Sequence, residues 1–240
     1  PFALWVSFPE PHSPYDFPID FKDRFDPKTF DIPKVGPEDA GQIPLIFRDL
    51  SPADKQGIIA SYYTSVAALD RNIGDVLKSL DQLGLASNTC VFYMADHGYC
   101  LGQHGRFEKH CGYEPALRVP LMVRYPGKVR QGAVVHQFTE HIDVPATITD
   151  LMGLDPLPVQ HGQSLKPYLE GKQPPKPRQH IFSQYLENEE VFTADANWKF
   201  IFGSGKRKRN RKTGTWGQRS GSKRAMVSLA EGDRIEIFGS

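Results

Sequence analysis

Three residues of different chemical character lie close together in this sequence: the carboxylic acid Asp96, the imidazole His97 and the amine Lys109. Gly98 follows the first two, and a residue without a Cβ atom lets the backbone approach a ligand closely. A carboxylate and an imidazole can bind a divalent cation, and a lysine ammonium can neutralise a substrate oxyanion beside it. The pattern therefore predicts hydrolysis of a charged ester, with Asp96 and His97 as metal ligands and Lys109 as a catalytic cation.

Each of these residues also has a simpler interpretation. Asp96 and His97 could be an ordinary polar pair that caps a helix and binds water, and Lys109 could be a solvated surface lysine. The neighbourhood favours the functional interpretation, because several more basic and imidazole side chains follow at once. Two ligands do not hold a hard cation such as calcium, so further ligands must come from elsewhere.

A second loop offers another candidate. His12 lies between Pro11 and Ser13-Pro14, in a stiff loop that follows a short apolar run. A histidine there can act as a general acid or donate a hydrogen bond to a leaving oxygen, although a lone loop histidine is more often simply solvated. We therefore predict a catalytic role for His12 only in combination with the 96–110 loop. Lower-ranked candidates for substrate contact are His104, His110 and Arg118.

Apolar runs and helix signals predict the elements that position these residues. Residues 1–8 and 89–95 are short apolar runs that end in polar loops, which is typical of buried parallel strands. The carboxyl ends of such strands face one crevice. Between them, Ser51-Pro52 begins a long amphipathic helix that ends before Gly84. The predicted fold class is α/β, with a mostly parallel central sheet flanked by helices.

The rest of the chain is less regular. Residues 14–50 are rich in Pro, Asp and Phe and predict a long surface excursion. We expect further strands at 119–125 and 134–139, helices at 143–153 and 165–169, a linker at 173–178, and strands at 180–185 and 198–202. The predicted domains are a partial α/β catalytic domain, 1–172, and a C-terminal part, 173–240, with a small antiparallel sheet.

Composition is that of an ordinary globular protein, with 240 residues, 39% of them apolar, and a net charge of +1. The segment 206–212 is strongly basic, which is typical of a solvated or disordered loop, and no specific nucleic-acid partner is expected. No apolar run is long enough to span a membrane. The chain opens at Pro1 without an initiator Met, so we expect it to be part of a longer protein. Cys90, Cys100 and Cys111 are too few and too irregularly spaced to predict a disulfide framework or a structural zinc site.

The loop with the candidate residues resembles a known family. The similarity lies in Ala95-Asp-His-Gly, in Leu101-Gly-Gln-His-Gly-Arg-Phe-Glu-Lys-His and in Tyr113-Glu-Pro-Ala-Leu-Arg-Val-Pro-Leu. These segments resemble the central region of the type I sulfatases, which belong to the alkaline-phosphatase superfamily. The Pro-His-Ser-Pro loop and the segment that starts at Asp143 also follow the family's order, so the resemblance covers residues 1–202.

The resemblance implies an α/β sandwich with a divalent metal, usually Ca²⁺, that hydrolyses sulfate esters. Asp96 and His97 match two metal ligands, and Lys109 matches the lysine that contacts both sulfate and nucleophile. His12 matches the histidine near the ester oxygen. The family's nucleophile is a formylglycine, made from a Cys or Ser in a Cys/Ser-X-Pro/Ala-X-Arg motif; its hydrated aldehyde attacks sulfur and then expels sulfate.

The chain departs from the family pattern in its nucleophile. None of its three cysteines is followed by that motif, and the family's N-terminal acidic pair is also missing. Both normally precede the residue that is Pro1 here, so we expect the central and C-terminal portion of a sulfatase, with the formylglycine only in the full-length protein. Beyond residue 202 the sequence also lacks the family's usual Leu-Tyr-Asp-Leu stretch.

The leading hypothesis is a sulfuric-ester hydrolase that acts on a sulfated small molecule or polysaccharide. Two alternatives stay open: a phosphonate monoester hydrolase or phosphodiesterase of the same superfamily, and an inactive, truncated anion-binding module. Neither the sulfate ester nor the oligomeric state is indicated by the residues. A periplasmic, extracellular or lysosomal location is compatible with the resemblance.

Overall fold

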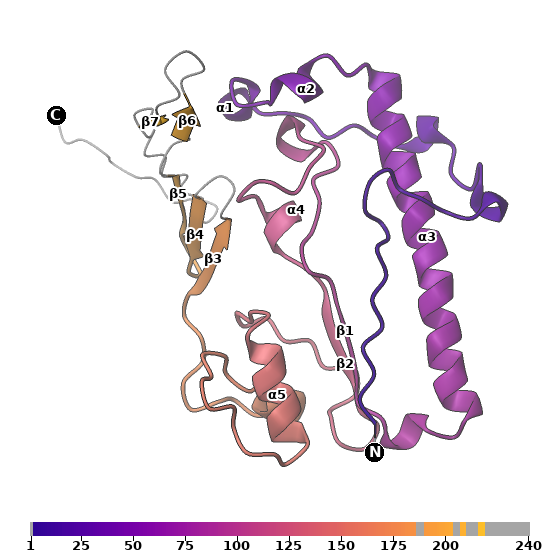
Figure 1. Cartoon of the computed structure of the whole chain (residues 1–240), viewed down its shortest axis with the longest axis vertical. Coiled ribbons are helices and arrows are strands. Elements are labelled where there is room, and N and C mark those ends of the chain that lie inside the picture. The colour runs from indigo at the N-terminus through magenta and orange to yellow at the C-terminus, as the bar shows by residue number, and fades with distance from the viewer. Residues whose placement is uncertain (1, 186–189, 204–206, 210–215, 219–240) are drawn as a thin grey trace. The chain divides into compact units, whose positions relative to one another are not determined.

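The computed structural model describes residues 2–185, 190–203, 207–209 and 216–218. Two compact units make up the chain, Pro1–Pro126 and Gly127–Ser240 (Figure 1). Helices and small sheets occur in both, which confirms the α/β class. The predicted domain boundary at 172/173 lies inside the second unit and stays a prediction. No helix in the described part of the chain is long and apolar enough to cross a membrane.

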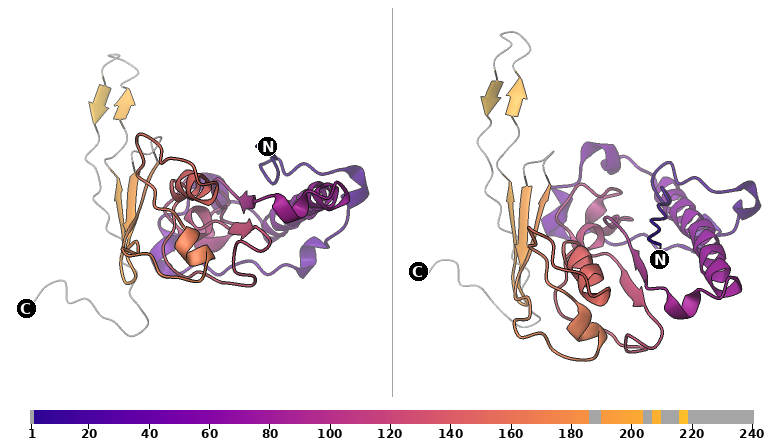
Figure 2. Two further views of the ribbon diagram at one scale, coloured as in Figure 1. Left: turned by 90° about the horizontal axis from the view of Figure 1, so that it is seen from below. Right: turned by 60° about the horizontal axis from the view of Figure 1, so that its bottom comes forward.

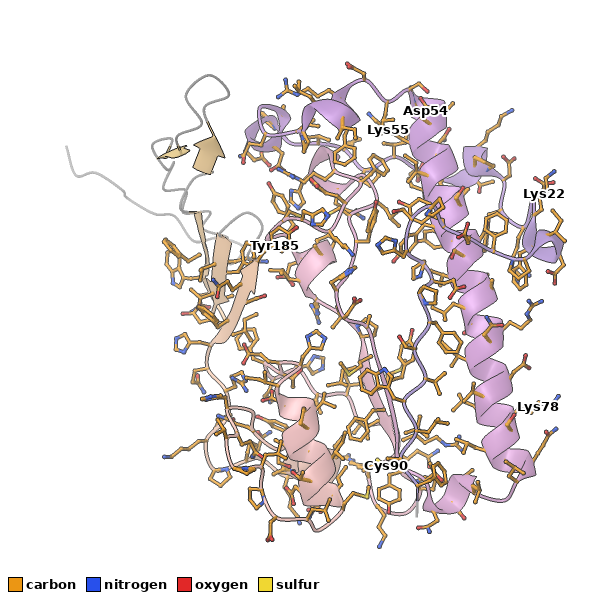
Figure 3. The ribbon with its side chains drawn as sticks, viewed as in Figure 1. Lys22, Asp54, Lys55, Lys78, Cys90 and Tyr185 are labelled. Atoms are coloured by element: carbon orange, nitrogen blue, oxygen red, sulfur yellow. The ribbon has the colours of Figure 1, made fainter. Side chains whose placement is uncertain are left out.

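One long helix, α3 (Pro52–Gln82), dominates the first unit. It begins with a capping box: the Ser51 hydroxyl accepts a hydrogen bond from the Asp54 backbone, and the Asp54 carboxylate accepts one from the Ser51 backbone. Figure 3 labels Asp54 and Lys78 toward the two ends of this helix. The structure confirms the predicted helix. It could be predicted because its start signal and apolar spacing are both local properties of the sequence.

The segment before α3 packs along the middle of that helix. The short 3-10 helices η1 (Ile19–Phe21) and η2 (Pro27–Thr29) both contact it. The Ser65 hydroxyl donates to the carbonyl of Asp16 at 2.9 Å. Tyr62 stacks on Tyr99 with ring centroids 5.7 Å apart, so aromatic packing joins α3 to the loop that follows residue 95.

Two strands in the first unit pair antiparallel, β1 (Val91–Met94) with β2 (Leu121–Arg124). The sequence predicted a mostly parallel central sheet, whereas every strand pairing among the described residues is antiparallel. Residues 2–8 form no strand, and Trp5 is 81% exposed. An apolar run predicts burial but not which strand lies beside it, and pairing direction depends on that neighbour.

Short helices lie before α3, between α3 and β1, and between the paired strands. They are α1 (Pro37–Ala40), α2 (Leu45–Arg48), η3 (Ala86–Asn88), η4 (Gln103–Gly105) and α4 (Glu114–Leu117). Helix α1 contacts η4, which brings residues far apart in the sequence into one cluster.

Among its described residues, the second unit contains two helices, a three-stranded antiparallel sheet and a separate pair of strands (Figure 2). The helices are α5 (Asp143–Leu151) and α6 (Lys166–Leu169). The sheet has the order β3 (Ile181–Tyr185), β4 (Glu190–Ala194), β5 (Lys199–Gly203). The predicted helices, the outer strands and the small antiparallel sheet are confirmed, whereas β4 was not predicted.

Two other predictions for this unit fail or fall partly outside the described residues. Residues 134–139 form no strand. Within the basic segment 206–212, only β6 (Arg207–Arg209) is described, and it pairs with β7 (Trp216–Gln218) instead of forming a loop. The remaining basic positions and the tail 219–240 lie outside the described part of the chain.

A buried ionic cluster holds the N-terminal end of α5 in this unit. Asp143 is 1% exposed, and its carboxylate pairs with Arg178, which also pairs with Glu140. The same carboxylate accepts hydrogen bonds from the backbone N–H groups of Glu140 and Gln163. These partners compensate the cost of burying the charge, so the cluster has a structural explanation.

Candidate functional site

The candidate site is built on the loop that leaves β1, and Gly98 fixes where this loop begins. The Gly98 backbone N–H donates to the carbonyl of Ala116 in α4 at 2.8 Å. A Cβ atom at position 98 would lie 2.0 Å from the carbonyl oxygen of Pro115. Only glycine allows this close approach of two backbones, so α4 is one structural reason for a glycine beside His97. The close approach to a ligand expected from the sequence stays a prediction.

Backbone hydrogen bonds then fold the loop back on itself. Cys100 donates to Glu108 at 2.9 Å, and Gly102 donates to Arg106 at 2.8 Å. The reversal between these pairs is possible because Gly102 has φ +101°. Because the loop doubles back here, Lys109 returns to the region where the loop began.

Lys109 and His97 are in direct contact as a result. Lys109 Nζ lies 2.8 Å from His97 Nε2, and His97 Nδ1 lies 2.8 Å from the carbonyl oxygen of Gly98. A carbonyl oxygen can only accept, so Nδ1 bears the imidazole proton and Nε2 accepts from the ammonium. Asp96 Oδ2 lies 3.4 Å from the same Nε2. The structure thus brings together three of the residues singled out from the sequence.

The donor set at this point fits part of a divalent-metal site. An imidazole protonated on Nδ1 and held by a backbone carbonyl is the form that binds a metal through Nε2. The Asp96 carboxylate faces that nitrogen and is 85% exposed. Among the described residues, however, no group of three or more His, Cys, Asp or Glu side chains could hold a metal ion. A hard cation would need further oxygen ligands besides the Asp96 carboxylate.

His12 lies on a separate loop that is tied to the first one. Its Nδ1 donates to the carbonyl of Ser13 at 2.7 Å, so Nε2 is the nitrogen of this exposed ring that stays available to a ligand. Three residues later, the Tyr15 hydroxyl donates to the Tyr99 hydroxyl at 2.8 Å. Tyr99 is two residues from His97, so the loops are neighbours. Among the described residues, no hydrogen bond or ion pair joins His12 itself to His97 or Lys109.

His104 lies at the turn of the loop and has a buried carboxylate partner. Its Nδ1 lies 2.7 Å from an oxygen of Asp39, which is 6% exposed. The hydroxyl of Tyr113 donates to the other Asp39 oxygen at 2.9 Å. The rings of His104 and Tyr113 stack with centroids 3.6 Å apart. Burial, together with the hydrogen bond to Asp39, raises the pKa of Tyr113 to about 12, so its hydroxyl remains a donor at neutral pH.

A second ion pair reinforces this part of the loop. Arg106 pairs with Glu108 and also donates to the carbonyl of Gln42 at 3.2 Å. The other two predicted substrate contacts, His110 and Arg118, are exposed. Arg118 follows the last residue of α4, and its backbone N–H donates to the carbonyl of Glu114, the first residue of that helix. Their roles stay predictions.

Sequence reasoning missed the residues that hold the candidate loop through hydrogen bonds and ring contacts. Asp39 is 65 positions away from His104 and lies in a segment without periodicity. Tyr99 and Tyr113 are close to the predicted residues, but no pattern distinguished them from ordinary loop tyrosines. Only the folded chain shows that Tyr99 joins the two candidate loops and that Tyr113 shares a carboxylate with His104.

Comparison with solved structures places this fold in a class. The chain superposes on the phosphonate monoester hydrolase from Silicibacter pomeroyi with a TM-score of 0.75 and 25% identity, over 93% of this chain and 48% of that one. It also matches a protein solved in complex with its substrate D-glucosamine-2-N,6-O-disulfate, with a TM-score of 0.61 and 28% identity, over 70% of this chain and 35% of that one. The fold is therefore that of the sulfatase and alkaline-phosphatase-like α/β proteins.

Sequence comparison gives the family. The sulfatase family model matches residues 1–154. The N-acetylglucosamine-6-O-sulfatase of Bacteroides thetaiotaomicron is 37% identical over 135 residues, which are 55% of this chain and 24% of that protein. The chain belongs to the sulfatase family. It spans less than half the length of each of the proteins compared here.

Proposed function

We propose that the protein containing this chain is a sulfuric-ester hydrolase, and that residues 95–113 form one side of its active site. The observation that supports this most strongly is the contact among Asp96, His97 and Lys109. A carboxylate, an imidazole lone pair and an ammonium meet at one point on a loop that hydrogen bonds hold in shape. That combination suits a divalent cation and the oxygens of an anionic ester.

The residues of this chain would have distinct tasks. The Lys109 ammonium would bind an oxygen of the sulfate group and neutralise its negative charge. His12 would give a proton or a hydrogen bond to the leaving oxygen. Asp96 and His97 would hold the metal, and a bound divalent cation, which we propose to be Ca²⁺, supplies electrostatic stabilisation of the sulfate charge.

The nucleophile has no candidate in this chain. Family membership implies a formylglycine and a divalent metal, and none of the three cysteines stands in a Cys-X-Pro/Ala-X-Arg motif. Cys100 and Cys111 are buried and contact each other. The hydrolytic reaction is therefore proposed for the complete protein, with the attacking group supplied from elsewhere.

A sulfated carbohydrate is the proposed substrate class. One relative is an N-acetylglucosamine-6-O-sulfatase, and one structural neighbour was solved with D-glucosamine-2-N,6-O-disulfate. The residues with assigned tasks would contact the sulfate end of the substrate, and they do not indicate which sugar carries it.

A second reaction is favoured by a specific finding, the similarity to a phosphonate monoester hydrolase with a TM-score of 0.75. An ammonium beside a metal site would also bind a phosphonate or a phosphodiester. Steady-state assays of the complete protein should compare an aryl sulfate with an aryl phosphodiester and an aryl phosphonate. We expect kcat/KM to be highest for the sulfate. Turnover of the phosphorus esters alone would replace the sulfatase assignment with this second one.

A further inference from the structure

Two of the three cysteines are in contact inside the loop that positions Lys109. The Sγ atoms of Cys100 and Cys111 lie 3.7 Å apart, and the residues are 0% and 7% exposed. Both are free thiols. Formation of an S–S bond of about 2.05 Å would require the two sulfur atoms to approach by less than about 2 Å in total.

We propose that Cys100 and Cys111 form a disulfide bond on exposure to an oxidising thiol–disulfide couple. The bond would cross-link the two ends of the 100–111 loop. The loop geometry favours this bond. Cys100 donates its backbone N–H to Glu108, three residues before Cys111, so the two ends of the loop are already held side by side. The bond therefore requires little change in the folded loop.

The chemistry is thiol–disulfide exchange with an external disulfide such as oxidised glutathione. The Cys111 thiolate attacks one sulfur of that disulfide, and the first glutathione leaves as a thiolate. The Cys100 thiolate then attacks the Cys111 sulfur of the mixed disulfide and expels the second glutathione. The two cysteines lose two protons and two electrons, and one oxidised glutathione becomes two thiols.

Cys111 is the better initial nucleophile of the two. It is the less buried residue, and a hydrogen bond from Cys100 lowers the pKa of its thiol. The contact with Cys111 and burial both raise the pKa of Cys100. Positive charge on Arg106 favours the thiolate form of either sulfur. Both thiols are buried, so exchange requires a brief local opening of the loop.

Peptide mapping tests the proposal directly. The purified protein is equilibrated with excess oxidised glutathione, treated with iodoacetamide under denaturing conditions, digested and analysed by mass spectrometry. We expect a cross-link between the peptides of Cys100 and Cys111, with Cys90 alkylated. Full alkylation of both Cys100 and Cys111 after equilibration would overturn the proposal.

Cys90 provides an internal control because it immediately precedes β1, whereas the other two cysteines follow that strand (Figure 3). In an unfolded chain, a Cys90–Cys100 bond would close a loop of nearly the same length as a Cys100–Cys111 bond, so both should form to a similar extent. Exclusive pairing of Cys100 with Cys111 therefore reports the folded loop. A mixture of pairings would contradict the proposed site.

Thermal unfolding gives an independent measurement. A cross-link between residues 11 positions apart restricts the unfolded chain, and we expect oxidation to raise Tm by roughly 5 °C. Cys90→Ser should keep this rise, whereas Cys100→Ser and Cys111→Ser should lose it. If peptide mapping shows the cross-link but Tm is unchanged, the bond strains the loop and does not stabilise it as proposed. Neither measurement depends on the hydrolytic reaction.

Discussion

At the scale of single residues, the candidate site depends on which atom of each side chain is available. His97 has its Nδ1 proton directed at the Gly98 carbonyl, and its Nε2 lone pair therefore faces Lys109 and Asp96. The Nδ1 atom of His104 instead faces the buried carboxylate of Asp39, and its ring stacks on Tyr113. The two histidines therefore differ in the partner of Nδ1, which is a backbone carbonyl for His97 and a carboxylate for His104.

Lys109 is the residue whose removal should affect the proposed reaction most clearly. In the complete protein, Lys109→Ala should lower kcat/KM toward an aryl sulfate by about 100-fold, the scale of losing one oxyanion donor. Lys78→Ala is the matched control, since Lys78 is exposed on α3 (Figure 3) and should leave the rate unchanged. A loss of less than about threefold for Lys109→Ala would exclude this lysine from the site.

At the scale of elements, the position of the loop relative to α4 depends on one close backbone approach. Gly98→Ala would place a Cβ atom 2.0 Å from the Pro115 carbonyl oxygen, so the loop must move away from α4. A displacement of about 1 Å at a catalytic group can cost about 100-fold in rate. We therefore expect Gly98→Ala to reduce kcat/KM of the complete protein by about that factor.

A second glycine gives the control for this substitution. Gly74 lies within α3, and a Cβ atom there would meet nothing within 4 Å. Gly74→Ala should keep full activity and stabilise the protein by about 0.5–1 kcal/mol, because alanine loses less backbone entropy in a helix. Urea unfolding and steady-state kinetics measure both variants. Equal activity of the two variants would show that the Gly98 contact does not position the loop.

At the scale of the whole molecule, the proposed reaction needs groups that this chain does not supply. The described residues offer two candidate metal ligands, Asp96 and His97, and one candidate catalytic cation, Lys109. The sequence contains no formylglycine motif. We expect the purified 240-residue chain to show no turnover of aryl sulfates, with or without added CaCl₂, because positioning groups do not replace a nucleophile. Metal-dependent turnover by this chain would contradict that expectation.

Local features of this protein follow from residues that are close together in the sequence. Helix α3 was predictable because its capping box and apolar spacing depend on residues a few positions apart. Asp96, His97 and Lys109 were recognisable because they lie in one short loop whose glycines and polar residues form a contiguous pattern. Residues 119–125 were expected to form a strand from their apolar character alone, and β2 lies within them.

The tertiary structure decided which distant parts of the chain meet. The antiparallel pairing of β1 with β2, the support of His104 by Asp39 and the link between Tyr15 and Tyr99 each join residues that no local pattern relates. The contact between Cys100 and Cys111 likewise depends on the reversal of the loop between them. Such contacts depend on how the chain packs, because a hydrogen bond or a strand pairing requires a partner in space and not a neighbour in sequence.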